Sequence, residues 1–145
     1  DAMLASRIEG VAPELRARLD EVADWMKANG GDDGEGCELE HLFHAGCYVR
    51  TLRVPKDKYF VSECLRIPTV LIVSGDAAFS DGENTFRITG YKVLTGAPMR
   101  QSIVRTFADT VFTAIFATNA KTQEEVEAEA VFRPDRLLKL SESQR

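Results

Sequence analysis

The amino-acid sequence predicts a mainly β domain with one helix before it and a shorter helix after it. Between residues 38 and 118 a series of short β-rich runs follows without a long helical pattern, which argues against a parallel sheet built from βαβ units. Runs of this length and spacing are typical of a sandwich, a jelly roll or a small barrel. The runs cover residues 48–54, 59–61, 69–73, 77–79, 85–88, 91–94, 102–105 and 110–116.

Turn-forming residues separate these runs and predict where the chain reverses. Asp81 and Gly82 stand between two β-rich runs, and this dipeptide favours a type I′ hairpin with positive φ at both positions. The other turns are expected at residues 55–57, 74–76, 89–90, 96–98 and 108–109.

Composition narrows the class of protein. The 145 residues fit one domain, and a hydrophobic content of 44% is too high for a disordered chain. A net charge of −5 argues against a protein that binds nucleic acid by neutralising phosphates, and no apolar run reaches the length of a membrane span. Three cysteines without a CxxC pair predict reduced thiols. The first residues lack a secretory signal pattern, so synthesis in the cytoplasm is expected.

Residues 1–29 are expected to form an N-terminal helical arm. Pro13 suits the first position of a helix and Glu14 suits its positive end, so a helix is predicted from about Pro13 to Ala28. This helix either packs on its own domain or reaches a neighbouring subunit or another protein. The acidic, glycine-rich residues 30–37 are predicted to be a linker, which leaves both arrangements open. Apolar residues at steps of three and four are candidate partner contacts: Leu4, Ile8, Val11, Leu15, Leu19, Val22 and Met26.

A short helix and a tail are expected over residues 121–145. Thr122 and Glu125 fit a capping box, in which the hydroxyl and the carboxylate satisfy free backbone N–H groups reciprocally. The buried side of the helix is predicted to hold Val126, Ala130 and Val131, and residues 133–134 are expected to end it. The tail carries an apolar cluster that is a second candidate for partner contact, formed by Leu137, Leu138 and Leu140.

Several motifs between residues 38 and 120 follow one another in a recognisable order. They are a strand that ends at residues 73–75, a hairpin at 81–83, Gly90, and a turn at 96–98. In this order they resemble the cupin superfamily, and the resemblance implies a double-stranded β-helix, or jelly roll. More closely, the sequence is similar to small cupin-like proteins encoded by tailed bacteriophages. This second similarity is carried by residues 41–44, 46, 48–50, 109–115 and 123–127.

The resemblance also shows where the sequence departs from a metal-binding cupin. Such a protein carries two histidines and a carboxylate near the strand before Gly75, and another histidine after the turn at 96–98. The corresponding positions here are Ser62, Cys64, Pro68 and Gln101. A proline side chain cannot bind a metal, and serine and glutamine are poor ligands for iron, manganese or zinc. Strand alternation sends Glu63 to the face opposite Cys64. We therefore expect no metal and no cofactor.

Other catalytic arrangements find little support. His41 and His44 are three residues apart, so on a strand they point to opposite faces and cannot share a metal. The sequence contains neither a G-x-S-x-G elbow nor a Walker loop, and no catalytic residue is assigned. If the barrel retains a ligand pocket in place of a metal site, its candidate residues are Cys64, Tyr91, Arg100 and Gln101.

The expected function is a non-catalytic structural or interaction module that forms homo-oligomers and contacts neighbours through its terminal segments. The phage resemblance implies a bacteriophage virion or assembly component that is made in the host cytoplasm and incorporated in the particle. Its partners would be further copies of itself and other virion or host proteins, with neither nucleic acid nor membrane. Two alternatives stay open: a metal-free cupin that binds or converts a small molecule, and a phage-encoded regulator of a host protein.

Overall fold

The computed structural model describes residues 7–29 and 35–132, which form a curled β sheet with two helices beside it. The strands are β1 (Arg7–Ile8), β2 (Glu38–His44), β3 (Cys47–Val54), β4 (Tyr59–Val61), β5 (Thr69–Ser80), β6 (Thr85–Gly96), β7 (Ile103–Thr106) and β8 (Thr110–Ala117). The helices are α1 (Pro13–Ala28) and α2 (Gln123–Ala130). The mainly β architecture, with an N-terminal helix and a short C-terminal helix, confirms the predicted fold class.

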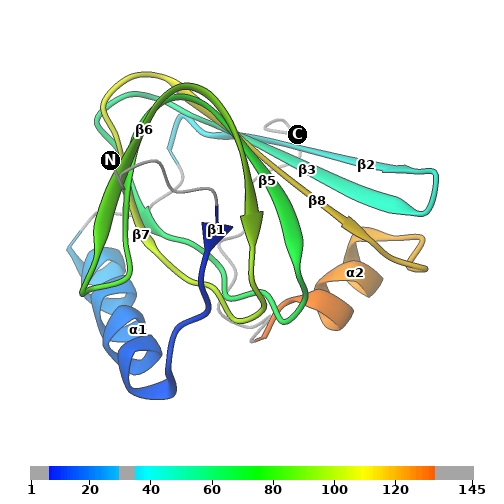
Figure 1. The fold of residues 1–145 in the computed structure, drawn as a ribbon, viewed down its shortest axis with the longest axis horizontal. Helices are drawn as coiled ribbons and strands as arrows, with labels where there is room; N and C mark the ends of the chain where they lie inside the picture. Colours follow the sequence, from blue (N-terminus) through cyan, green and yellow to red (C-terminus); the bar gives the residue numbers. More distant parts are fainter. Residues whose placement is uncertain (1–6, 30–34, 133–145) are drawn as a thin grey trace.

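The sheet curls around an interior at one end, and its paired strands follow an open, branched path. One path through it runs β1-β6-β5-β8-β3-β2, while β7 pairs with both β5 and β4. All pairs are antiparallel except β1 with β6. In Figure 1, β5 and β6 curl around the barrel on one side, and β2, β3 and β8 extend from it as a flatter sheet. The inner faces of these strands enclose the barrel interior.

Strands β5 and β6 form one long hairpin, where the turn residues predicted four short strands. Each strand has 12 residues. Gly75 and Gly90 lie opposite each other across the hairpin, with φ of 146° and 79°. They bend the strands without ending them, so the turns expected at 74–76 and 89–90 are wrong. A Cβ at Gly75 would lie 2.5 Å from Oγ1 of Thr110, so the bend also requires a residue without a side chain.

The tip of this hairpin is not the predicted type I′ turn. Its loop runs from Asp81 to Asn84, and of these residues Gly82 alone has a positive φ, of 100°. The Asp81 carboxylate accepts hydrogen bonds from the backbone N–H groups of Glu83 and Asn84, both at 2.8 Å. The aspartate side chain supplies the bonds of the turn, and this stabilises a longer loop than the dipeptide predicted.

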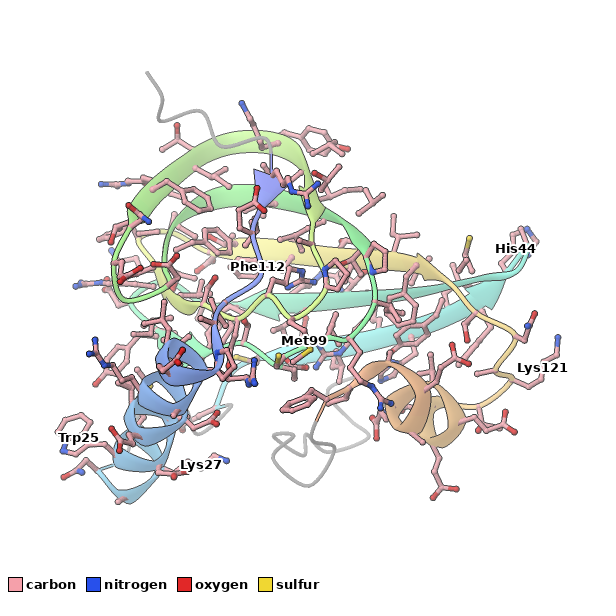
Figure 2. All side chains as sticks on the ribbon, turned by 60° about the horizontal axis from the view of Figure 1, so that its bottom comes forward. Trp25, Lys27, His44, Met99, Phe112 and Lys121 are labelled. Carbon is pink, nitrogen blue, oxygen red and sulfur yellow. The ribbon has the colours of Figure 1, made fainter. Side chains whose placement is uncertain are left out.

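Helix α1 has the predicted bounds and packs against β4 of its own chain. Trp25 and Lys27 are exposed, and Figure 2 shows them on opposite sides of α1. Of the candidate partner contacts, those buried within the chain are Ile8, Val11, Leu19 and Met26. Leu15 and Val22 are half-buried, whereas Leu4, Leu137, Leu138 and Leu140 lie outside the described residues. The structure thus contains the first of the two expected arrangements, and contact with a partner stays a prediction.

Helix α2 begins with the predicted capping box. The Thr122 hydroxyl accepts from the backbone N–H of Glu125 at 3.1 Å, and the Glu125 carboxylate accepts from the N–H of Thr122 at 3.2 Å. The helix ends at Ala130, before the expected stop at residues 133–134, and Val131 lies just beyond it in an extended conformation. The described part of the chain therefore places Val131 outside the helix, although it is buried as expected.

Contacts with the loop before β5 explain why α2 ends early. Val131 forms a β-bridge with Leu65. The guanidinium of Arg66 donates to the carbonyl oxygens of Ala128 and Glu129, at 2.5 and 2.7 Å. These bonds satisfy carbonyl groups that a helix C-terminus leaves free. They also fasten α2 to the barrel.

Two apolar clusters form the core. The first lies between β5, β6, β7 and β8 and includes Leu71, Val73, Phe79, Leu94, Val104 and Phe112. The second lies where β3 and β8 meet α2, and its buried members are Tyr48, Phe116, Val126 and Ala130. Among the described residues, no helix is long and apolar enough to cross a membrane.

Candidate ligand cavity

A cavity of about 340 Å³ lies inside the barrel and is lined by residues of both apolar clusters. Its apolar walls include Leu39, Leu52, Phe60, Leu71, Phe79 and Phe112. Figure 2 shows Phe112 within the ring of strands. Helix α2 contributes Gln123, Glu124 and Glu127, and because Glu124 is exposed, this helix lies where the cavity meets solvent.

An ion pair crosses the cavity wall between β3 and the loop after β4. Nη1 of Arg50 lies 2.6 Å from Oε1 of Glu63, and the two side chains are 26% and 23% exposed. Arg50 shares its strand face with Tyr48 and Leu52, because alternate residues of a strand point the same way. Each charge is therefore neutralised by the other at the edge of an apolar interior.

Arg100 lines the same cavity from the loop between β6 and β7. The residue is 7% exposed, and its Nε donates to Oγ1 of Thr69 at 3.1 Å. Burial lowers the pKa of the Arg100 guanidinium, and the negative charge of Glu63 opposes this shift. Because an arginine pKa starts so high, the group stays protonated. The cavity thus contains the Arg50–Glu63 ion pair and the further positive charge of Arg100, while Glu124 and Glu127 add carboxylates on the α2 side.

Two serines join the segments that carry these charges. The Ser62 hydroxyl accepts a hydrogen bond from the backbone N–H of Ser102 at 3.0 Å, and the backbone N–H of Ser62 donates to the carbonyl of Ser102 at 2.9 Å. Both serines line the cavity, next to Glu63 and close to Arg100 in sequence. The Ser62 hydroxyl is therefore engaged in holding the loop after β4 against β7.

Of the four predicted pocket residues, the cavity contains Arg100. Cys64 is buried but does not line the cavity, and Tyr91 is 68% exposed on the outside of β6. Gln101 is buried and its Nε2 donates to Oδ1 of Asp20 on α1 at 3.4 Å. Gln101 therefore connects the barrel to the N-terminal helix, and the three residues are not brought together.

The positions at which a cupin would hold a metal do not fit one. Ser62 accepts from Ser102, Gln101 is directed to α1, and Pro68 is exposed. Within residues 7–29 and 35–132, no group of three or more His, Cys, Asp or Glu side chains could hold a metal ion. His41 and His44 lie on opposite faces of β2, as predicted: His41 is half-buried and contacts the Tyr48 hydroxyl through Nδ1, while His44 is exposed.

Sequence reasoning did not select Arg50 and Glu63 as pocket residues, although a signal for Arg50 was present. Arg50 has the same strand parity as Tyr48 and Leu52, and a charged residue on the apolar face of a strand indicates a buried partner or a ligand. The opposite orientations of Glu63 and Cys64 were expected. That expectation assumed a strand, whereas both residues follow the end of β4 at Val61, and the adjacent Ser62 and Glu63 both line the cavity.

No protein-family model matches the sequence, and no curated protein matches it. Solved structures with a similar fold include a cupin superfamily protein from Desulfitobacterium hafniense, 10% identical, with 59% of this chain and 80% of that chain covered and a TM-score of 0.49. A cupin-2 domain protein from Shewanella frigidimarina is 10% identical, with 55% and 78% covered and a TM-score of 0.45. A cupin domain from Bordetella pertussis is 15% identical, with 57% and 94% covered and a TM-score of 0.46.

Proposed function

We propose that this domain binds a small organic molecule in the barrel cavity and does not catalyse its conversion. The observation that carries the proposal is the cavity of about 340 Å³, with apolar walls and a few convergent polar groups. Pockets for small molecules have this composition, and their volumes begin at roughly 300 Å³. Protein interiors are otherwise packed with few voids larger than a water molecule.

The polar groups of the cavity suit recognition better than catalysis. Arg50 and Glu63 are held in an ion pair, and Ser62 is held by Ser102. A nucleophile needs an adjacent general base; the described lining residues include no histidine or lysine, and the Glu63 carboxylate is held by Arg50. The arrangement supports a binding protein, which is the small-molecule alternative expected from the sequence.

Methyl NMR tests whether the cavity takes a ligand. We expect 3-phenylpropanoate or its neutral amide at millimolar concentration to shift the methyl signals of Leu52, Leu71 and Val104, all of which line the cavity. Ala114→Phe fills the cavity from β8 and should abolish the shifts. Thr113→Phe places the same side chain on the other face of the same strand and should leave them intact.

Two outcomes would contradict the proposal. The first is an absence of methyl shifts with both compounds. The second is a set of shifts that persists in Ala114→Phe while circular dichroism shows that variant folded. If Ala114→Phe does not fold, the smaller Ala114→Met takes its place in the same comparison.

A second candidate is the self-associating interaction module, and the outer face of the sheet favours it. In register, Val70, Ile115, Val49 and Leu42 form one row across β5, β8, β3 and β2. The next row begins with Val93 and Ile72. Several of these side chains are strongly exposed: Leu42 at 56%, Val93 at 52% and Val70 at 40%. Contiguous apolar patches of this kind mark interaction sites.

The self-association candidate makes its own prediction. Light scattering coupled to size-exclusion chromatography should give a dimer or larger oligomer, and Val93→Lys should shift it to monomer. Trp25→Lys, on the exposed side of α1, is the matched control. A monomer at high concentration would overturn this candidate. A more specific version of this candidate is a role in a phage particle. Mass spectrometry of purified particles tests it, and the protein should be found there in many copies.

A further inference from the structure

We infer that the ligand is an apolar monocarboxylate whose carboxylate is bound by Arg100. This inference rests on the proposed function and adds the chemical class of the ligand. Three features of the cavity carry it: an incompletely used guanidinium, the position of that guanidinium beside an ion pair that is already neutral, and apolar walls beyond the charged groups.

The guanidinium of Arg100 has binding capacity to spare. It carries five N–H donors, and among the described residues its one hydrogen bond runs from Nε to Thr69 at 3.1 Å. The residue is 7% exposed and lines the cavity, so the remaining donors are open to the cavity, where a ligand could take the place of water. Nη1 and Nη2 form a planar fork that matches the two oxygens of a carboxylate.

The charge balance selects a monoanion. Glu63 lies 2.6 Å from Arg50, so this pair is neutral together, and the positive charge of Arg100 remains. One ligand carboxylate in contact with Arg100 would neutralise the positive charge of its guanidinium. A second negative charge would have no arginine of its own, because Arg50 is already engaged.

Helix α2 strengthens this selection at the cavity entrance. Glu124 and Glu127 line the cavity from the helix, and Glu127 accepts a hydrogen bond from Nε2 of Gln123 at 2.8 Å. The Glu124 carboxylate disfavours an anionic group at this end and leaves Arg100 as the favourable place for negative charge. Between the two ends, walls such as Leu52, Leu71 and Phe112 suit an apolar body.

Calorimetry with three probes of one shape tests the inference on the unmodified protein. The probes are 3-phenylpropanoate, its neutral amide and 3-phenylpropylamine. A hydrogen-bonded charge of this kind corresponds to about tenfold to hundredfold in affinity, so the acid should bind more tightly than the amide by that factor. The amine should bind more weakly than either. Equal affinities of acid and amide, or tighter binding of the amine, would overturn the inference.

Phenyl phosphate tests whether the site accepts a ligand headgroup with two negative charges. It presents a similar ring with a doubly charged headgroup, and it should bind more weakly than 3-phenylpropanoate. If phenyl phosphate binds more tightly, the site accepts a dianion and the assignment to monocarboxylates is wrong.

Substitutions at Arg100 test whether this residue causes the preference for the acid over the amide. Arg100→Met should remove the preference for the acid over the amide, and Arg100→Lys should retain part of it, because lysine keeps the charge but lacks the fork. Arg105→Met is the control, since Arg105 is exposed on β7 and does not line the cavity. Binding of the amide by Arg100→Met reports that the variant is folded. A full preference retained in Arg100→Met would overturn the role of Arg100.

Failure of this inference is distinguishable from failure of the proposed function. If acid and amide bind equally and Ala114→Phe abolishes both, the cavity binds ligands but does not select a carboxylate. If neither compound binds the unmodified protein, the proposed function fails and this inference falls with it.

Discussion

Nε of Arg100 lies 2.3 Å from the point where a Cβ atom at Gly96 would stand. Gly96 ends β6 and Arg100 follows four residues later, so the turn folds the arginine side chain back over the glycine backbone. The absence of a side chain at Gly96 therefore positions the guanidinium in the cavity. The same glycine backbone lies close to Thr69, whose hydroxyl accepts from Arg100 and would stand 2.9 Å from the Cβ.

Gly96→Ala should destabilise the domain by about 1–3 kcal/mol, because overpacking forces the buried arginine to move. Arg100→Ala removes the atoms nearest to the added methyl group. Gly96→Ala should therefore cost less in the Arg100→Ala background than in the unmodified protein. A double-mutant cycle by urea denaturation measures this difference. Strict additivity of the two substitutions would contradict the proposed clash.

Arg87→Gln should raise the pKa of Asp76 toward its ordinary value of 3.8. In the folded protein, the hydrogen bonds from Arg87, both 2.7 Å long, hold the pKa of this carboxyl below that value. A lowered folded pKa stabilises the protein above the unfolded pKa, and this contribution disappears as the pH falls through the folded pKa. In the variant, the folded pKa of Asp76 lies closer to its unfolded value. The stabilisation from this carboxylate is therefore smaller, and it disappears at a higher pH than in the unmodified protein.

Carbon NMR of the Asp76 carboxyl, titrated from pH 6 downward, measures this shift. Arg105→Gln is the matched control, because Arg105 also stacks on the Phe107 ring, with its Cζ 4.9 Å from the centroid against 4.1 Å for Arg87. An unchanged Asp76 titration in Arg87→Gln would show that the contact does not form in solution.

Thr122→Ala should destabilise α2 by about 0.5–2 kcal/mol, because it removes the N-cap hydroxyl that accepts from the Glu125 N–H. Amide hydrogen exchange should become faster in α2 than in the barrel strands. Thr122→Asp keeps an acceptor at the N-cap and should retain most of the protection. Equal exchange in Thr122→Ala and the unmodified protein would mean that barrel contacts alone hold the helix.

Thr106→Val should destabilise the domain by about 1–3 kcal/mol, although the two side chains have nearly the same shape. Thr106 is fully buried; its hydroxyl donates to the carbonyl of Pro55 at 2.7 Å and accepts from the N–H of Lys58 at 3.0 Å. Valine leaves both backbone groups without this partner. Thr89→Val, at an exposed position of β6, should change the free energy of unfolding by less than about 0.5 kcal/mol. Thermal denaturation of the two variants gives the comparison.

The elements that sequence reasoning located correctly depend on neighbours along the chain. Pro13 at the start of α1 and the Thr122–Glu125 capping box act within four residues, so their patterns could be interpreted directly. The Asp81–Gly82 turn was misjudged even so, since the aspartate side chain formed bonds that favour a longer loop.

The long hairpin could not be deduced from its glycines. Gly75 and Gly90 are typical turn residues, yet in β5 and β6 they lie opposite each other and bend two continuous strands. Whether such a glycine reverses a chain or curves it depends on the strand that pairs with it, and here Thr110 of β8 occupies the space beside Gly75.

The sequence alone determined the mainly β class and the two helices, because these follow from periodicity and local capping. The tertiary structure decided which face of each strand is interior. It placed Arg50 and Glu63 together in the cavity with Arg100, and it directed Gln101 toward α1. Within a strand, alternation states that neighbouring side chains point apart, but the direction in which the sheet curls determines which of them points inward.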